Sequence, residues 1–323
     1  MVAKQGYRAV IVAVVCLATW IVCGNAEAAV RLELKLGKGK TYYERSVIEQ
    51  RITQEVMGQQ QVIDIAIGMG EKLDVLDVDE KGNMQVRYTY IWSRLKQAGP
   101  MMALDYDSSQ PTAALAGAEG FAALLGQGYT MRLSPKGEVL DVGGVEELAK
   151  VVREKAPGVD LSSPGNPLAS LLDAQALKEM TENSLAVYPD KPVEPGDSWT
   201  RARVVRQGMA MIAENKWTLQ KLEGGVATIQ ATSSLKADPN GPPLETQGMA
   251  MKLDLSGTQE STIQIQQTTG LATANRGLQE LKGQVRIGAS PQGPFDMMAI
   301  PMAIQTKFTM EMSDRMWEKE PAK

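Results

Sequence analysis

The residue types that carry most protein catalysis are scarce in this sequence. No histidine occurs among its 323 residues, and its only cysteines are Cys16 and Cys23. Ser-His-Asp and Cys-His arrangements are therefore excluded, as are metal sites ligated by imidazole. The chemistry that stays open is a serine with a lysine base, a pair of carboxylates, a cation held by oxygen ligands, or copper held by methionine.

Two local patterns could supply such chemistry, and neither has the context that it requires. Ser93 and Lys96 have the Ser-x-x-Lys spacing but end a predicted strand instead of opening a helix. The acidic stretch 77–82 resembles the start of a calcium loop, but Lys81 and Tyr88 stand where oxygen ligands are needed. We expect a chance spacing and a solvated turn. Two acids that meet in space leave no sequence signature, so a carboxylate pair stays open.

Methionine is unusually frequent, with 18 in the chain against three phenylalanines. Met-x-Met pairs at 209–211, 249–251 and 310–312 have a spacing that suits monovalent copper. Alternatively, these thioethers occupy alternate strand positions and fill a core or line an adaptable apolar cavity. We favour the second interpretation because the pairs fall in two-faced strands. The sequence therefore predicts no catalytic, cofactor-binding or metal-binding residue and no cofactor.

Three tryptophans, Trp92, Trp199 and Trp217, lie in or beside predicted strands. Partial burial at the edge of a core is the expected environment, with one hydrogen-bond acceptor for each indole N–H. Carbohydrate stacking is the alternative, but nothing in the spacing aligns the three rings on one face. We favour the core-edge interpretation.

The first 28 residues predict a secretory signal peptide. Lys4 and Arg8 precede an apolar run over 9–23, and small residues around Ala28 fit a signal-peptidase site. Cleavage after Ala28 implies a periplasmic or extracellular protein. Lipidation of Cys23 is the less favoured alternative, because a valine precedes it where a small residue is expected.

Composition of the remaining chain limits its partners. The formal net charge is −4 and the two signs are interspersed, so no basic patch favours nucleic acid. Cleavage would remove both cysteines, which leaves no possible disulfide. No second long apolar segment follows the leader, and we expect no integral membrane segment after cleavage.

Alternating polarity predicts that most of the chain is β-strand. The clearest case is 302–312, where the even positions, which are mostly apolar, and the more polar odd positions fall on opposite faces. The even positions are Met302, Ile304, Thr306, Phe308, Met310 and Met312. Four hairpins are predicted, with turns at 79–83, 134–137, 223–225 and 268–270.

Helical periodicity appears between two β-rich stretches, at 145–155 and 168–185, with a weaker helix at 113–125. These patterns predict a β-dominated α+β fold, in which two antiparallel sheet halves, related by a possible duplication, are joined by a helical segment. The predicted parts are a signal peptide (1–28), an N-terminal β-rich half (29–142), a helical segment with a Pro-rich connector (143–196) and a C-terminal β-rich half (197–323).

The stretch from Pro192 to Trp199, with its P-x-x-P-G-D-S-W junction, resembles an uncharacterised family of exported bacterial proteins, catalogued only as a domain of unknown function. The turn at 268–271 and the strand start at 37–42 fit the same pattern. This resemblance covers nearly all of the chain after the leader and implies a shared fold, with no catalytic residue. The architecture is also distantly similar to periplasmic lipoprotein carriers, whose curved sheet holds acyl chains in an apolar cavity.

Two-faced, methionine-rich strands without a catalytic constellation lead to one functional hypothesis. We expect an exported, non-enzymatic protein of the cell envelope that binds an apolar or amphipathic ligand, such as a lipid. The alternative is a structural or protein-interaction module of the envelope without a ligand cavity. An enzyme that uses paired carboxylates ranks third, and two acids close together in a cleft, one of them desolvated, would favour it.

Overall fold

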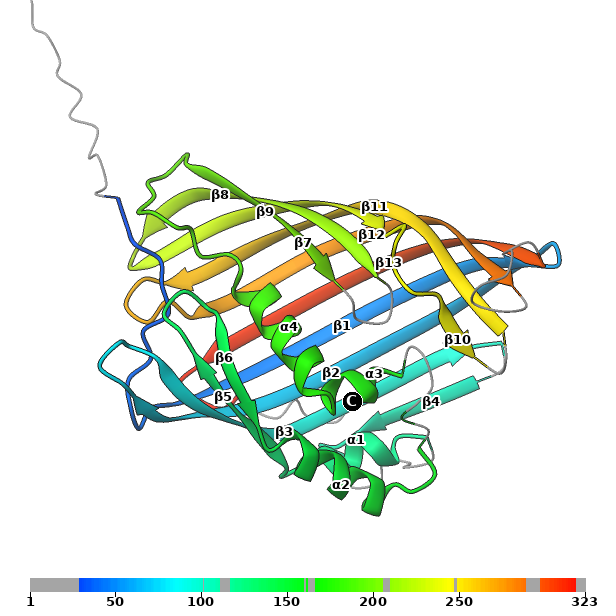
Figure 1. The fold of residues 1–323 in the computed structure, drawn as a ribbon, viewed down its shortest axis with the longest axis horizontal. Coiled ribbons are helices and arrows are strands. Elements are labelled where there is room, and N and C mark those ends of the chain that lie inside the picture. Colours follow the sequence, from blue (N-terminus) through cyan, green and yellow to red (C-terminus); the bar gives the residue numbers. More distant parts are fainter. Residues whose placement is uncertain are drawn as a thin grey trace, which may run out of the picture.

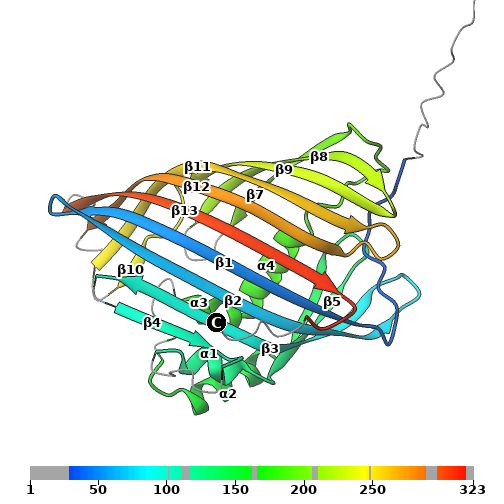
Figure 2. The ribbon, with the colours of Figure 1, turned by 180° about the vertical axis from the view of Figure 1, so that it is seen from behind.

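The structure is a computed structural model that describes residues 29–100, 102–110, 117–159, 161, 166–205, 210–246, 249–288 and 297–317. Within these ranges the chain forms one antiparallel sheet, with helices on one of its faces (Figures 1 and 2). The predicted β-dominated α+β class is confirmed, whereas the predicted signal peptide lies outside the described residues. None of the described helices is long and apolar enough to cross a membrane.

The strands vary from three to 20 residues in length. They are β1 (Thr41–Val56), β2 (Gln59–Val78), β3 (Met84–Gly99), β4 (Met102–Asp107), β5 (Gly128–Leu133), β6 (Val139–Gly143), β7 (Ser198–Val205), β8 (Met211–Glu223), β9 (Val226–Ala237), β10 (Leu244–Thr246), β11 (Met249–Gln266), β12 (Ala272–Gly288) and β13 (Met298–Ser313). The helices are α1 (Glu119–Leu124), α2 (Val145–Lys155), α3 (Pro167–Leu171) and α4 (Ala174–Leu185). All four predicted hairpins are confirmed by β2–β3, β5–β6, β8–β9 and β11–β12.

Strand order brings the first and the last strand together in the middle of the sheet. It runs β6-β5-β3-β2-β1-β13-β12-β11-β9-β8-β7, with β4 also paired to β3 and β10 to β11. β1 pairs with β13 from Tyr43 opposite Ser313 to Gln54 opposite Met302. The N-terminal and C-terminal β-rich stretches therefore form one continuous sheet, and the helical segment connects its two outer edges. The proposed duplication and domain boundaries stay predictions.

Cross-strand register defines two faces of the sheet. Tyr42 lies opposite Leu73, and both belong to the core cluster that contains the helix residue Leu177. We call the face that carries these side chains the inner face. It is the concave face of the curved sheet in Figures 1 and 2. Even positions of β13 lie on this face, and odd positions at 305–311 are exposed. The predicted alternation is confirmed.

One β-bulge changes which residues of β3 face inward. Glu71 pairs with Tyr90, but the preceding Gly70 pairs with Trp92, so Ile91 has no direct partner on β2. The extra residue reverses the alternation of the strand. Tyr90 therefore points to the inner face and Trp92 to the outer one.

Helix α2 begins and ends where the sequence predicts, but the helix expected at 168–185 is two helices. Asn166 caps α3 by accepting a hydrogen bond from Leu168 N, and Asp173 caps α4 by accepting one from Ala176 N at 2.6 Å. Asp173 separates α3 from α4, because its backbone is extended. The weaker predicted helix is confirmed only as α1, and 111–116 lie outside the described residues.

The segment 29–37 crosses one end of the sheet and connects turns that are distant in sequence. Leu34 N donates to Pro135 O and Lys35 N donates to Thr269 O, each at 2.8 Å. Tyr188, beyond α4, donates its hydroxyl to Gly270 O at 2.7 Å. These contacts bind the N-terminal segment, the β11–β12 turn and the helical segment together.

Gly270 provides a test of this junction. Its φ is +69°, and a Cβ there would lie 2.0 Å from the carbonyl oxygen of Glu33. We expect Gly270→Ala to lower the free energy of unfolding by several kcal/mol, measured by chemical denaturation. The control is Gly225→Ala, which also has positive φ but no atom within 4 Å of the added Cβ; it should cost only about 1–2 kcal/mol. Equal losses would contradict the proposed close approach.

Candidate functional site on the inner face

The middle of the inner face presents apolar side chains that are not fully covered. Ile48 of β1 lies opposite both Ile67 of β2 and Phe308 of β13, and Met69 and Met310 occupy the next row. Ile48 is 45% exposed, and the other four are partly buried. These five residues form the apolar strip. Its accessibility contrasts with that of the buried core beneath the helices.

A row of polar residues crosses the inner face beside the apolar strip. Register places Asn215, Ser233, Gln259, Gln279, Thr306 and Gln50 in this row, on six successive strands. Neighbouring members hydrogen-bond in pairs: Ser233 Oγ to Asn215 Oδ1 at 2.6 Å, Gln50 Nε2 to Thr306 Oγ1 at 3.3 Å, and Gln279 Nε2 to Gln259 Oε1 at 3.5 Å.

This polar row separates two apolar regions of the inner face. On the side of the helices lies the main core, and on the other side lies a smaller cluster that includes Leu235, Leu281 and Ile304. An apolar surface divided by amide and hydroxyl groups suits a molecule that has both apolar and polar parts.

Two carboxylates face each other at the other border of the apolar strip. Glu44 of β1 is directly opposite Glu71 of β2 on the inner face. Burial raises the pKa of Glu44 to about 7. Burial and the nearby charge of Glu44 raise the pKa of Glu71 to about 8, against the opposing effect of its hydrogen bond to Tyr129. Near neutral pH the pair therefore retains protons that free glutamates release.

Three tyrosines surround this carboxylate pair. Tyr129 donates its hydroxyl to Glu71 Oε1 at 3.2 Å and stacks on Tyr88, with 5.0 Å between ring centroids. Tyr90, which pairs with Glu71, is 1% exposed. Desolvation raises the pKa of each tyrosine, so all three keep their protons at neutral pH. The surroundings of the pair are aromatic and uncharged, and this favours neutral carboxyls.

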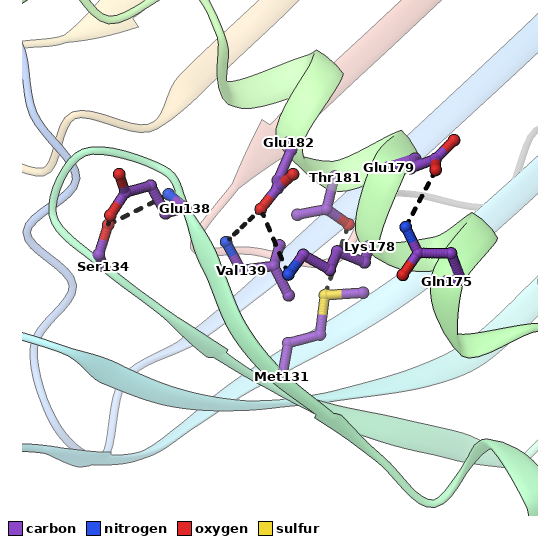
Figure 3. A network of polar contacts seen from close by, with 9 residues as sticks. All are labelled: Met131, Ser134, Glu138, Val139, Gln175, Lys178, Glu179, Thr181 and Glu182. Carbon is purple, nitrogen blue, oxygen red and sulfur yellow. Dashed lines mark hydrogen bonds and ion pairs between the residues drawn. The ribbon is translucent and has the colours of Figure 1, made fainter. Parts of the chain in front are cut away.

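Helix α4 lies across the inner face and contacts the edge of the sheet that β5 and β6 form (Figures 1 and 3). Glu182 Oε1 accepts a hydrogen bond from Val139 N of β6 at 3.1 Å. Thr181 donates its hydroxyl to the sulfur of Met131 on β5 at 3.4 Å. Figure 3 shows these contacts side by side. They attach the helix to the β5–β6 hairpin.

The residues after α4 contact the opposite edge strand, β7. Trp199 Nε1 donates to Val187 O at 2.9 Å, and Arg201 Nη2 donates to Tyr188 O at 3.0 Å. The helical segment thus bridges β6 and β7. A pocket of about 470 Å³ lies between these edges.

The structure brings few of the sequence candidates together. Ser93 points to the inner face and donates to Phe121 O, whereas Lys96 lies on the outer face, so no serine–lysine pair forms. Asp79 accepts hydrogen bonds from the backbone N–H groups of Lys81 and Asn83. The predicted solvated turn is confirmed.

Some tryptophans and methionines have the environments predicted for core residues, whereas Met249 of the second Met-x-Met pair is 40% exposed. Trp92 donates to Asp107 Oδ1 at 2.9 Å, and Trp199 stacks with the buried Trp217. Met84 and Met131 are fully buried, and Met310-x-Met312 faces inward. Met209 lies outside the described residues.

The carboxylate pair is the feature that sequence reasoning missed. A detectable signal existed, because Glu44 interrupts an alternation of mostly uncharged residues at inward positions of β1, between Tyr42 and Ser46. Its partner could not be found without the register of β1 and β2.

Comparison with known proteins places the chain in a family. A model described as a family of unknown function (DUF6263) matches residues 81–272, more than half of the chain. The chain belongs to this family. The predicted resemblance to an uncharacterised family is thereby confirmed. No curated protein matches.

Among solved structures, the chain is similar to one described as showing lipid–protein interactions in lipovitellin. The TM-score is 0.52 at 11% identity, and the match covers 89% of this chain and 27% of that one. This likeness shows a shared fold alone. An acetoacetate decarboxylase-like enzyme from Sphingomonas wittichii RW1 (TM-score 0.15, 7% identity, 85% of this chain and 91% of that one) and Pseudomonas aeruginosa OpdL (0.18, 7%, 84% and 98%) are too dissimilar to inform the fold.

The raised carboxyl pKa values predict that stability falls as pH rises. Between the unfolded glutamate pKa near 4.5 and the folded values of about 7 and 8, the folded chain holds more protons than the unfolded chain. Unfolding therefore becomes easier through this window, by about 1.4 kcal/mol per unit of pKa difference. We expect the Tm to fall by several °C from pH 5 to pH 8.5. Glu71→Gln should flatten this pH dependence of the Tm, and the exposed control Glu49→Gln should leave it unchanged. If both variants flattened the pH dependence equally, the assignment of the raised pKa values to Glu44 and Glu71 would be contradicted.

Attachment of α4 can be tested at Glu182. Glu182→Ala leaves the N–H of the buried Val139 without an acceptor and should destabilise the protein by about 1–3 kcal/mol. Glu182→Gln keeps an acceptor oxygen and should cost less. Hydrogen exchange at the Val139 amide measures the effect directly. Unchanged protection in Glu182→Ala would show that the contact does not hold the helix to β6.

Proposed function

We propose that this protein is an exported, non-enzymatic protein of the cell envelope that binds an apolar or amphipathic ligand on the inner face of its sheet. The observation that carries the proposal is the apolar strip. Ile48 stays 45% exposed although it lies on the same face as the main core. An accessible apolar surface inside a curved sheet is a typical place for a hydrophobic ligand.

Polar borders on both sides of the apolar strip support an amphipathic ligand. The row that includes Gln50 and Thr306 lies on one side, and the carboxyl pair Glu44 and Glu71 lies on the other. A ligand with an apolar chain and a polar end could satisfy both kinds of surface. The likeness of fold to lipovitellin, whose structure is described as showing lipid–protein interactions, supports the same class of ligand.

Two other functions are alternatives to ligand binding: a protein-interaction module and an enzyme. A protein-interaction module would have a filled inner face and would bind no lipid. An enzyme would use Glu44 and Glu71 as acid and base, and their raised pKa values favour it. Against this, the stacked and buried tyrosines Tyr88 and Tyr129 pack beside the pair and fill space that a substrate would need.

Ligand binding can be tested with a matched pair of variants. Ile48→Gln places an amide on the apolar strip, and Leu278→Gln makes the same change on the outer face, where Leu278 is 37% exposed. We expect Ile48→Gln to weaken binding of a fluorescent fatty acid about tenfold, while Leu278→Gln binds like the wild type. Fluorescence titration gives both affinities. No binding by the wild type would favour the interaction module, and equal effects of the two variants would place the ligand elsewhere.

Export has its own test. Expression of the full chain with a C-terminal tag, followed by cell fractionation and N-terminal sequencing, should yield a secreted or periplasmic protein that begins at Ala29. A cytoplasmic protein that retains Met1 would contradict this part of the proposal.

A further inference from the structure

In the pocket between the two sheet edges, the acidic and the basic side chains differ in how well they are paired within the protein. Its walls come from the N-terminal segment, the β5–β6 turn, the end of α4 and β7. We call it the seam pocket. It has four basic residues, Arg31, Lys136, Arg201 and Arg203, and four acidic ones, Glu33, Glu138, Glu182 and Asp190.

Each acidic side chain of the seam pocket already has a partner. Glu33 pairs with Lys35 at 2.9 Å, and Asp190 pairs with Arg201 at 2.8 Å. Glu182 accepts from Val139 N, and Glu138 accepts from the Ser134 hydroxyl at 3.3 Å. Three of these carboxylates therefore lie in ion pairs, since Glu182 also pairs with Lys178 at 4.0 Å, whereas Glu138 is held by a neutral hydroxyl.

Arg201 and Arg203 lie on the same face of β7 but differ in their bonding. The guanidinium of Arg201 donates to the carbonyl oxygens of Ala186 and Tyr188 and to Asp190. Arg203 is partly buried, and its Nε is buried without a hydrogen-bond partner among the described residues. No described acidic side chain lies within ion-pair distance of it. A buried guanidinium N–H without an acceptor is unfavourable, so this position has an unmet need for an anion or another acceptor.

The position of Arg203 connects the seam pocket with the inner face. Arg203 is opposite Ala213 of β8, which belongs to the smaller apolar cluster with Leu235 and Ile304. Arg203 thus lies between the polar walls of the seam pocket and the smaller apolar cluster.

We propose that the seam pocket binds an oxyanion, a phosphate or carboxylate, which forms the headgroup of an amphipathic ligand, and that Arg203 is its principal contact. This inference rests on the proposed function for the apolar part of the ligand. Planar guanidinium groups bind such oxyanions through two parallel hydrogen bonds, and the exposed Arg31 and Lys136 add positive charge at the pocket wall.

The experiment compares three probes by isothermal titration calorimetry: dodecyl phosphate, the uncharged dodecyl maltoside, and inorganic phosphate, with the detergents below their micelle concentrations. The variants are Arg203→Met, Arg203→Lys and the control Arg286→Met, which removes the same charge from an exposed position of β12. We expect Arg203→Met to weaken dodecyl phosphate binding about tenfold, Arg203→Lys to have a smaller effect, and Arg286→Met to have none. Affinity for dodecyl maltoside should not change.

The outcomes separate this inference from the proposed function. If both detergents bind the wild type equally and Arg203→Met changes neither affinity, the oxyanion site is refuted and apolar ligand binding stands. If inorganic phosphate binds as tightly as dodecyl phosphate and depends on Arg203, the oxyanion site stands and its amphipathic ligand is refuted. Absence of binding by all three probes overturns both. Equal losses in Arg203→Met and Arg286→Met would show a general charge effect and refute the site.

Discussion

Backbone pairing between β1 and β13 is the constraint on which the rest of the molecule depends. It makes the first and the last strand central, so that both β-rich stretches share one inner face. It also leaves β6 and β7 as the outer edges. An apolar face of this size must be covered, and the chain between these edges is the helical segment that covers it. The helices therefore follow from the strand order, and the contacts of α4 with β6 and of the following residues with β7 hold the curved sheet around its core.

The inner face is not uniformly apolar, and its polar groups explain its division. A hydrogen-bonded row that includes Gln50 and Thr306 crosses it, and the pair Glu44 and Glu71 borders the apolar strip. Buried polar groups reduce stability unless they are paired, and buried carboxyls are tolerated here mainly as neutral acids. Such groups are unnecessary for a core that only has to be filled. Their arrangement around the accessible Ile48 agrees with the proposed ligand surface. Arg203, in the seam pocket, is the separate contact proposed for the charged end of the ligand.

Local patterns allowed much of the fold to be predicted from the sequence. Alternation over Met302–Met312 identified the inner face of β13, and glycine-containing turns identified four hairpins. The β1–β13 pairing could not be predicted, because its partners are separated by almost the whole chain and no local signal specifies strand order. The break before α4 was missed because helical periodicity continues through Leu171 and Leu172, although Asp173 is a good cap. The acidic pair and the unpaired Arg203 depend on register and on tertiary neighbours, which a single sequence does not contain.

Mapping where a lipid contacts the protein tests whether the inner face is the ligand surface. A photoreactive fatty acid can be crosslinked to the purified wild-type chain, and the modified residues can be identified by peptide mass spectrometry. We expect crosslinks on the inner face of β1, β2 and β13, at Ile48 and its neighbours Ile67 and Phe308. Crosslinks confined to outer-face residues such as Leu278, or a protein that takes up no fatty acid, would contradict this expectation.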